Sequence, residues 1–364
     1  MKKIPFNISK PFTLGCELEV RLVDSASLAP VGKSSLIFEN LPLFLKSSIH
    51  PELLMSMVEI VTPVCKTPKE AVDFIKKASE SLNETGLKEG FRLNAAGTHP
   101  FVNDKELDIV DDPRYLKAYE EFGVLLDRFR VCGLHIHAGF ESQEKVVRAY
   151  NFIITYLPIF LALSASSPFF DGEFTKIQSF RSKIVEQIPR TDVPERFENY
   201  GDFEYMLDIL LKSRAIESVK DIRWDIRIHP DFGTLELRIC DSINDFDTIE
   251  LLIALYQALS LFSQKMPPVK SFCQIDKQNK WYSAKYALEG KFINNDDRII
   301  TIKEKAVELL KEMKVHNVFE ELNLQKYENL LFDLLEKKSI SQMMIEEYER
   351  SKDLKKIVQM GVIE

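Results

Sequence analysis

The fold of this chain can be worked out from the segment LGCELEVR, residues Leu14–Arg21. Its apolar and charged residues alternate, which is typical of a β-strand with one buried face. The apolar residues would point into a core, so that Glu17, Glu19 and Arg21 share the opposite face. Two carboxylates at this spacing lie only about 7 Å apart, and they repel each other unless a cation or a basic group lies between them. A solvated strand face balanced by Arg21 explains this segment alone, but the pattern recurs further along the chain.

Two further segments continue the pattern. The segment MSMVEIVTP, residues Met55–Pro63, is rich in β-formers and ends at a proline, so it predicts a strand. Its carboxylate, Glu59, needs a basic partner or a metal ion unless the strand is a half-exposed edge. The segment CGLHIHAGF, residues Cys132–Phe140, places His135 and His137 on one strand face. Two imidazoles at this spacing can ligate a metal ion or contact an anionic ligand, although the pair alone is compatible with a structural role.

A β-hairpin is predicted between Trp224–Pro230 and Gly233–Asp241, which are separated by a short turn. In the second of these strands, Glu236, Arg238 and Cys240 alternate with apolar residues. The alternation places them on one strand face. A carboxylate and an arginine therefore again share a face.

The rest of the chain is predicted to be mainly helical. Thr67 can be the N-cap of a helix that begins at Pro68, with Glu70 as its capping-box partner. From Phe246 onward, apolar residues recur with a helical period. We find no Ser/Gly-rich linker and no internal repeat. We therefore expect residues 1–364 to form one domain, with residues 291–364 as its helical C-terminal extension.

The composition is that of a soluble globular protein, since 45% of the 364 residues are hydrophobic and 29% are charged. The net charge of −8 argues against a nucleic-acid partner, because phosphate backbones are bound by basic surfaces. It does not exclude ATP, which local cations can hold inside an acidic protein. The five cysteines are scattered without a CxxC pair, which argues against a disulfide scaffold or a zinc site.

Neither the beginning of the sequence nor its most apolar run predicts a membrane segment. Met1–Pro5 is charged but is not followed by an apolar stretch. The run Phe152–Leu163 is short and contains Pro158, so we expect a buried helix there and not a membrane span. A cytoplasmic protein that acts on small molecules is therefore expected, and a homodimer is compatible with the sequence.

The polar faces of the predicted strands would form a metal-binding surface if the strands belong to one antiparallel sheet with helices behind it. Carboxylate oxygens combined with an imidazole suit Mg²⁺ or Mn²⁺ better than structural zinc. Such ions leave positions open for substrate phosphates, and arginines can stabilise the charge of a transferred phosphoryl group. No P-loop, kinase glycine loop or Rossmann fingerprint is present in the sequence. The residues gathered on this surface are Glu17, Glu19, Glu59, Glu236, His135, His137, Arg21 and Arg238.

The motifs, taken in order, resemble those of the glutamate–cysteine ligase type 2 family, the bacterial carboxylate–amine ligases. They extend over residues 12–290 with family-like spacing. Each motif is weak alone, whereas the ordered set is fairly specific. The matching segments are Gly15–Glu19, Glu59–Pro63, Gly97–Pro100, Cys132–His137, Ser167–Phe169, Gly233–Arg238 with Asp241, and Asn279–Trp281.

The resemblance implies an α+β fold like that of glutamine synthetase and the guanidino kinases. Its core would be a curved, mostly antiparallel sheet with flanking helices, open as a funnel. It also implies ligation that depends on ATP and on Mg²⁺ or Mn²⁺. A carboxylate would be activated as an acyl phosphate, and an amine would then displace phosphate. The simplest product joins the γ-carboxylate of glutamate to cysteine or to another small amine.

The resemblance also implies roles for individual residues, carried over position by position. The implied metal ligands are Glu17, Glu19, Glu59, His135 and Glu236. The implied catalytic residues are Arg238 and Glu236, and the implied contacts to ATP are Arg21 and Arg238. The implied substrate contacts are Thr98, His99, His137, Arg181 and Arg190. For His99, a structural role in its turn is an equal alternative.

Two segments depart from the family pattern. Lys176–Gln178 stands where the family usually has a Gly-Tyr pair, and Asp192 stands where it usually has glycine. Both lie in the region expected to shape the amino-acid pocket. They therefore concern the choice of amino-acid substrates more than the chemistry of ATP.

Two other interpretations are compatible with parts of the sequence. A non-catalytic relative could bind a nucleotide or an amino acid as a sensor or partner, but the complete carboxylate set argues for catalysis. A cupin-like metal enzyme is suggested by the spacing of His135, His137 and Glu141. Against it, Arg148 stands where that motif needs a glycine, and a long apolar helix is predicted next.

Overall fold

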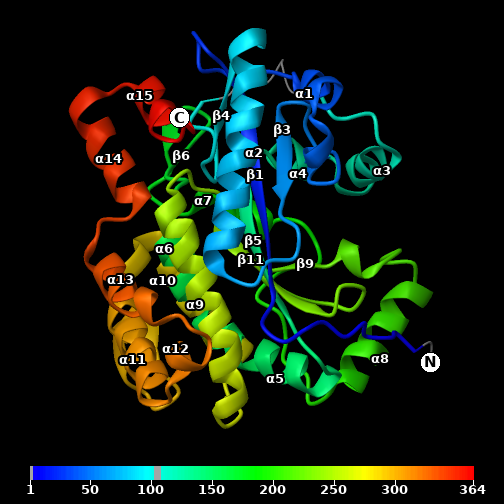
Figure 1. Ribbon diagram of the computed structural model, residues 1–364, viewed down its shortest axis with the longest axis vertical. Coiled ribbons are helices and arrows are strands. Elements are labelled where there is room, and N and C mark those ends of the chain that lie inside the picture. Colours follow the sequence, from blue (N-terminus) through cyan, green and yellow to red (C-terminus); the bar gives the residue numbers. More distant parts are fainter. Residues whose placement is uncertain (1–2, 102–107) are drawn as a thin grey trace.

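The computed structural model describes residues 3–101 and 108–364, so that Met1 and Lys2 of the charged N-terminal segment lie outside it. At its centre is a seven-stranded sheet with the order β10-β11-β5-β1-β3-β2, in which β4 also pairs with β1 (Figure 1). The described pairings in this sheet are antiparallel, as predicted. Its strands are β1 (Leu14–Asp24), β2 (Ile49–Pro51), β3 (Met57–Val61), β4 (Phe91–Asn94), β5 (Gly133–Gly139), β10 (Ile226–His229) and β11 (Thr234–Asp241).

Helices and three two-stranded ribbons surround this sheet, which makes the fold α+β. The ribbons are β6 (Phe169–Phe170) with β7 (Glu173–Phe174), β8 (Thr191–Asp192) with β9 (Arg223–Trp224), and β12 (Lys291–Ile293) with β13 (Ile299–Thr301). The first eight helices are α1 (Ser34–Asn40), α2 (Pro68–Glu89), α3 (Pro113–Phe122), α4 (Val124–Asp127), α5 (Gln143–Ile153), α6 (Leu157–Ser164), α7 (Phe180–Val185) and α8 (Tyr200–Lys212). The later ones are α9 (Phe246–Lys265), α10 (Cys273–Tyr286), α11 (Ile302–Val315), α12 (Val318–Glu321), α13 (Gln325–Glu336), α14 (Ile340–Ser351) and α15 (Leu354–Met360).

Strand β1 has the predicted alternation. Cys16, Leu18 and Val20 are at most 1% exposed and belong to the main hydrophobic core. Helices α2 and α9 cover this apolar face, and Figure 1 shows α2 lying along β1. The opposite face of β1, which carries Glu17 and Glu19, lines the cavity described below.

Helix α2 begins as predicted, with one difference in its cap. The Thr67 hydroxyl accepts a hydrogen bond from the amide of Glu70 at 3.2 Å. The Glu70 carboxylate accepts from the amide of Lys66 instead of that of Thr67, so the reciprocal half of the predicted capping box is displaced by one residue. The other end is closed by Gly90, whose φ of 75° suits glycine.

Among the residues that the structure describes, two helical segments are long and apolar enough to cross a membrane, but both lie largely in the core. In the apolar windows of Gln143–Ser164 and Phe246–Lys265, 89% and 78% of the residues are buried inside the protein. The first contains Phe152–Leu163, which the sequence predicts as a buried helix. A 3₁₀ turn at Ile154–Tyr156 separates α5 from α6, with Pro158 in the first turn of α6.

The C-terminal helices pack in two groups. Helices α11 and α13 contact α6 and α9 respectively, whereas α14 and α15 lie near β4 (Figure 1). Beyond α15, the amide of Ile363 donates to the carbonyl of Leu93, and the amide of Ala95 donates to the carbonyl of Gly361. The edge of β4 is thus covered by residues from the far end of the sequence.

Two local predictions are wrong. A β-bulge between Leu237 and Cys240 shifts the register of β11 against β5. Cys240 therefore faces the hydrophobic core and not the face of Glu236 and Arg238. In addition, the helical period predicted from Phe246 onward is interrupted by β12 and β13, so that Ile299–Thr301 is a strand and α11 begins only at Ile302.

Candidate functional site

The polar face of the sheet forms the floor of a cavity of about 460 Å³. Its side chains come from β1, β3, β5 and β11. Each polar pair is set by strand register. Glu17 lies opposite His135, Glu19 lies opposite Glu59, and Glu236 lies opposite His137. The predicted gathering of these six side chains on one sheet face is therefore present.

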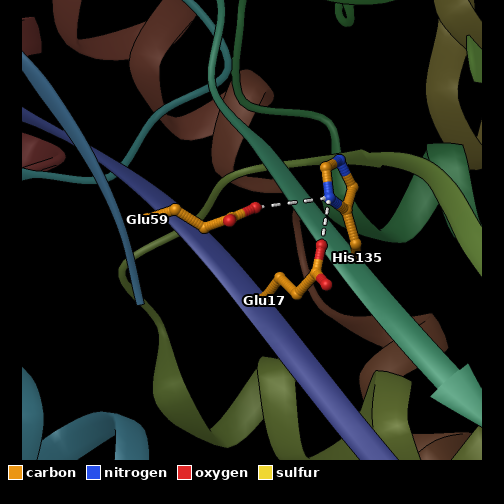
Figure 2. A group of neighbouring side chains, drawn as sticks. All are labelled: Glu17, Glu59 and His135. Atoms are coloured by element: carbon orange, nitrogen blue, oxygen red, sulfur yellow. Dashed lines mark hydrogen bonds and ion pairs between the residues drawn. The ribbon is translucent and has the colours of Figure 1, made fainter. Parts of the chain in front are cut away.

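The first potential ligand set consists of Glu17, Glu59 and His135. The Nδ1 atom of His135 lies 3.1 Å from Oε2 of Glu17 and 4.0 Å from Oε1 of Glu59. Figure 2 shows the three side chains converging from neighbouring strands. One donor atom from each residue lies within 4.8 Å of the other two, which is a suitable spacing around one cation.

The second set consists of Glu17, His137 and Glu236. The Nε2 atom of His137 lies 3.2 Å from Oε1 of Glu17 and 3.9 Å from Oε1 of Glu236. These residues also offer donor atoms within 4.8 Å of one another. Glu17 belongs to both sets and bridges them. His137, which the resemblance places among substrate contacts, is thus also positioned as a candidate metal ligand.

A third carboxylate group adds a residue that the sequence did not reveal. Glu52 follows β2 and lies with Glu19 and Glu59. Burial and the nearby Glu19 carboxylate raise the pKa of Glu52 to about 8. Burial, Glu17 and Glu52 likewise raise the pKa of Glu59. Glu52 is not predicted from the sequence, because the residues around it do not alternate between apolar and polar.

The two histidines respond differently to this environment. Burial and the charge of Arg238 lower the pKa of His135, which keeps its ring neutral. Burial disfavours the charged ring of His137 too, but Glu236 and Glu17 outweigh it and raise the pKa of His137. Burial alone would raise the pKa of Glu17, yet hydrogen bonds from both histidines hold it well below its usual range.

These residues fit a divalent metal ion. The Nε2 atom of His135 is buried and has no hydrogen-bond partner among the described residues. A neutral imidazole beside several carboxylates is a donor set that Mg²⁺ or Mn²⁺ accepts. Burial raises the pKa values of Glu52 and Glu59, and the neighbouring carboxylates raise them further by a repulsion that a cation would relieve.

Two arginines, one on β10 and one on β11, form ion pairs with Glu236. The Nη2 atom of Arg227 lies 2.6 Å from Oε2 of Glu236, and Arg238 pairs with Oε1. Burial opposes ionisation, but the two guanidinium groups keep the pKa of Glu236 far below its usual range. Arg227 is not among the residues predicted from the sequence, although it shares the polar face of the predicted hairpin strand with Asp225 and His229. Both arginines line the cavity.

Arg181, an implied substrate contact, lies on the cavity wall at the start of α7. Its Nη1 and Nη2 atoms donate to the carbonyls of Ile239 and Arg238 at 3.3 and 3.4 Å. A Cβ atom at position 133 would lie 2.2 Å from Nη2 of Arg181, so Gly133 leaves the space that this guanidinium occupies. Packing therefore explains why glycine stands at position 133 in the family-like segment Cys132–His137.

Arg21 and Arg190 do not line this cavity in the part of the chain that the structure describes. Arg21 is 1% exposed, and its Nη2 atom donates to the carbonyl of Arg130 at 2.9 Å. Arg190 pairs with Glu121 at 2.8 Å. The roles expected of these two arginines, as contacts to ATP and to a substrate, therefore stay predictions that the cavity lining does not support.

Thr98 and His99 also lie outside the cavity lining formed by residues 3–101 and 108–364. The Thr98 hydroxyl donates to the carbonyl of Phe169 at 2.7 Å. The Nε2 atom of His99 donates to the carbonyl of Leu28 at 2.9 Å, and the amide of Phe101 donates to Nδ1. Burial lowers the pKa of His99 to about 3. These contacts favour the structural alternative for His99 over a substrate contact.

The two departures from the family pattern also lie away from the cavity wall, as far as the described residues show. The Gln178 side chain accepts a hydrogen bond from the Ser341 hydroxyl at 2.7 Å. Asp192 has a φ of 76°, and its carboxylate binds Lys280 and Lys277 at 3.0 and 3.1 Å. Lys280 is buried and also contacts Asp225 at 2.6 Å. Asp192 is thus part of an ion-pair cluster behind the cavity.

Comparison with known proteins identifies relatives along almost the whole chain. The model of glutamate-cysteine ligase family 2 (GCS2) matches residues 13–358. A protein of Herpetosiphon aurantiacus named "Putative glutamate--cysteine ligase 2" is 33% identical over 355 residues, covering 96% of this chain and 91% of its own length. A Sorangium cellulosum protein of the same name is 36% identical over 290 residues, covering 78% of this chain and 77% of its own length.

A solved structure shares the fold at low sequence identity. The glutamate–cysteine ligase of Francisella tularensis, solved in complex with AMP, superposes with a TM-score of 0.72. Its sequence identity is 13%, and the match covers 98% of this chain and 89% of the other. The sheet that forms the floor of the cavity therefore belongs to a fold that this solved structure shares.

Proposed function

Because this chain belongs to the glutamate-cysteine ligase family 2, we propose that it is an ATP-dependent carboxylate–amine ligase that releases ADP and phosphate. Its product would be γ-glutamylcysteine or a similar γ-glutamyl amide. The observation that carries this proposal is the sharing of Glu17 between the Glu17–Glu59–His135 and Glu17–His137–Glu236 sets. The names of the relatives support the substrates, and the AMP bound to the F. tularensis enzyme supports the use of a nucleotide.

Divalent cations, Mg²⁺ or Mn²⁺, fit the donor atoms of this floor. The proposed ligands are Glu17, Glu19, Glu59, His135 and Glu236, to which the geometry adds Glu52 and His137. When bound, such ions neutralise charge on the phosphate oxygens of ATP. The fixed pairs of Glu236 with Arg227 and Arg238 hold that part of the floor rigid before any substrate arrives.

The proposed reaction has two steps. A substrate carboxylate oxygen attacks the γ-phosphorus of ATP, and the bond to ADP breaks. The amine then attacks the carbonyl carbon of the acyl phosphate, and phosphate leaves with the bonding electrons. Arg238 would contact the transferred phosphoryl group, because its side chain remains 19% exposed next to Glu236. Arg181, which also lines the cavity, would contact the carboxylate of the amino-acid substrate. Holding both reactants in line accounts for most of the rate gain in such a site.

We further propose that the chain forms a single domain and acts in the cytoplasm. A continuous hydrophobic core includes residues from Leu14 to Ile363. The cysteines are free thiols, four of them buried, which suits a reducing compartment. Small-molecule substrates are the proposed partners.

The test is ADP release from purified protein with ATP and Mg²⁺. Glutamate, aspartate and glycine are each supplied with a panel of amines that includes cysteine. We expect ADP release that requires both an acid and an amine, with glutamate and cysteine among the substrates. Glu17→Gln and Glu236→Gln should each reduce this rate by about 100-fold or more, because each weakens the binding of the cation that would neutralise the reacting phosphates.

Glu144→Gln is the matched control, since Glu144 is an exposed glutamate of α5 outside the cavity. It should release ADP at the wild-type rate. Wild-type protein that binds ATP with Mg²⁺ but releases no ADP with any pair of substrates would contradict a ligase and favour a nucleotide sensor.

A further inference from the structure

The cavity wall beyond β10 carries a stacked pair of aromatic rings that the proposed chemistry does not use. His229 ends β10, and Phe232 lies in the turn that leads to β11. Their ring centroids are 4.1 Å apart and their planes differ by 5°, so one face of Phe232 rests on the imidazole. Both residues line the cavity, but His229 is 2% exposed whereas Phe232 is 54% exposed. The remaining surface of Phe232 is thus available on the cavity wall.

The turn that carries Phe232 is held rigid by the N-terminal segment. The amide of Asn7 donates to the carbonyl of Pro230 at 2.9 Å, and the Ser9 hydroxyl donates to the carbonyl of Phe232 at 2.7 Å. Gly233 has a φ of 63°, and a Cβ atom there would lie 1.6 Å from the carbonyl oxygen of Asn7. A large side chain held in this way loses little conformational entropy when a ligand covers it.

The ring pair lies next to the groups proposed to hold phosphates. The ring centroid of His137 is 6.2 Å from those of both His229 and Phe232. The cavity wall on this side also carries Arg223, Arg227 and Arg238. A flat apolar surface therefore adjoins a cluster of cationic groups and the Glu17–His137–Glu236 set. A ligand with a planar base joined to a chain of phosphates matches both parts, whereas glutamate and cysteine have no ring to stack.

We infer that Phe232, backed by His229, is the surface on which the base of the nucleotide stacks. This inference rests on the proposed function, which requires ATP in the same cavity. Stacking on an aromatic side chain does not distinguish one base from another, because every base presents a π-face. Phe232 therefore contributes affinity for nucleotides in general, and it does not select adenine over guanine.

The test compares the binding of ATP and of tripolyphosphate, each with Mg²⁺, by titration calorimetry. Phe232→Ala should bind ATP about 5-fold to 100-fold more weakly than wild type, which is the usual effect of removing a base-stacking ring. Its affinity for tripolyphosphate, which has no base, should not change. GTP should lose affinity by the same factor as ATP. Phe232→Trp, which preserves a flat ring, should restore ATP binding.

Phe272→Ala is the matched control, because Phe272 is 75% exposed and lies outside the cavity lining. Equal affinity of wild type and Phe232→Ala for ATP would overturn the inference and leave the ligase proposal intact. Equal weakening for ATP and tripolyphosphate would also overturn it, since the effect would then lie at the phosphates. Wild-type protein that fails to bind ATP would overturn the proposed function together with this inference.

Discussion

Single residues of the site were the easiest part to predict, provided that they lay on a regular strand. Glu17, Glu19 and His135 were found from alternation alone, because adjacent strands place every second side chain on the same face. Glu52 could not be found in this way, since it belongs to a short edge segment after β2. Cys240 was assigned to the wrong face because a bulge is a property of two strands together and leaves no trace in the sequence of one.

His99 makes the stability of the protein depend on pH. Its folded-state pKa of about 3 lies below the value near 6.5 of an unfolded chain. Between these values the unfolded state binds more protons, so stability is complete above pH 6.5 and falls as the pH decreases toward 3. We expect His99 to account for a loss of about 2 kcal/mol in the free energy of unfolding between pH 7.5 and pH 5.

Chemical denaturation at several pH values checks this expectation. His99→Gln should unfold more readily at pH 7.5 but should lack this part of the pH dependence. His50→Gln serves as the control, because His50 is an exposed histidine. An unchanged slope of stability against pH in His99→Gln would show that other groups cause the dependence.

At the scale of elements, the longer strands and the main helices follow from the sequence, whereas the short strands and the connections do not. The apolar periods of α2 and α9 are visible in the chain, and so is the hairpin of β10 and β11. Strands β8 and β9 pair although they lie about thirty residues apart in the chain. Each has only two residues, which is too few to show the alternation of apolar and polar residues that identifies a strand. The geometry of this ribbon depends on the ion pairs of Lys280, which are tertiary contacts.

Lys280 joins α10 to three other segments of the chain. Its ammonium group contacts Glu186 at 2.8 Å, Asp192 at 3.0 Å and Asp225 at 2.6 Å, and its side chain is 1% exposed. Removing the ammonium would leave carboxylates without their shared partner. We therefore expect Lys280→Met to reduce the free energy of unfolding by about 3–5 kcal/mol.

Urea denaturation measures this loss. Lys277→Met is the matched control, because Lys277 pairs with Asp192 from a side chain that is 42% exposed. It should cost at most about 1 kcal/mol. If Lys280→Met and Lys277→Met lost similar amounts of free energy of unfolding, the burial of Lys280 would not add to the stability of the protein.

For the whole molecule, the strand patterns predict one antiparallel sheet with helices behind it. The resemblance to the glutamate–cysteine ligase family adds which α+β fold this sheet belongs to. The proposed cation ligands on that sheet would make the stability of the folded state depend on divalent cations. We expect Mg²⁺ with ADP, at about 100 times the dissociation constant, to raise the melting temperature by about 3–4 °C. The physical reason is that the ligands bind only the folded state.

Differential scanning fluorimetry tests this expectation, with EDTA as the reference condition. In Glu17→Gln the increase should be much smaller, because Glu17 belongs to both ligand sets. An equal increase in wild type and Glu17→Gln would place the stabilising cation elsewhere.

The pairing of β4 with the distant C-terminal segment has a consequence for synthesis on the ribosome. Hydrogen bonds in this region join residues 264 to 280 positions apart in the chain. At translation rates of about 5–20 residues per second, β4 emerges on the order of 10 to 60 s before the segment that covers its edge. During that interval an unpaired strand edge is accessible to other nascent chains. Added chaperones during production should therefore increase the yield of correctly assembled protein more than they would for a fold closed by local contacts.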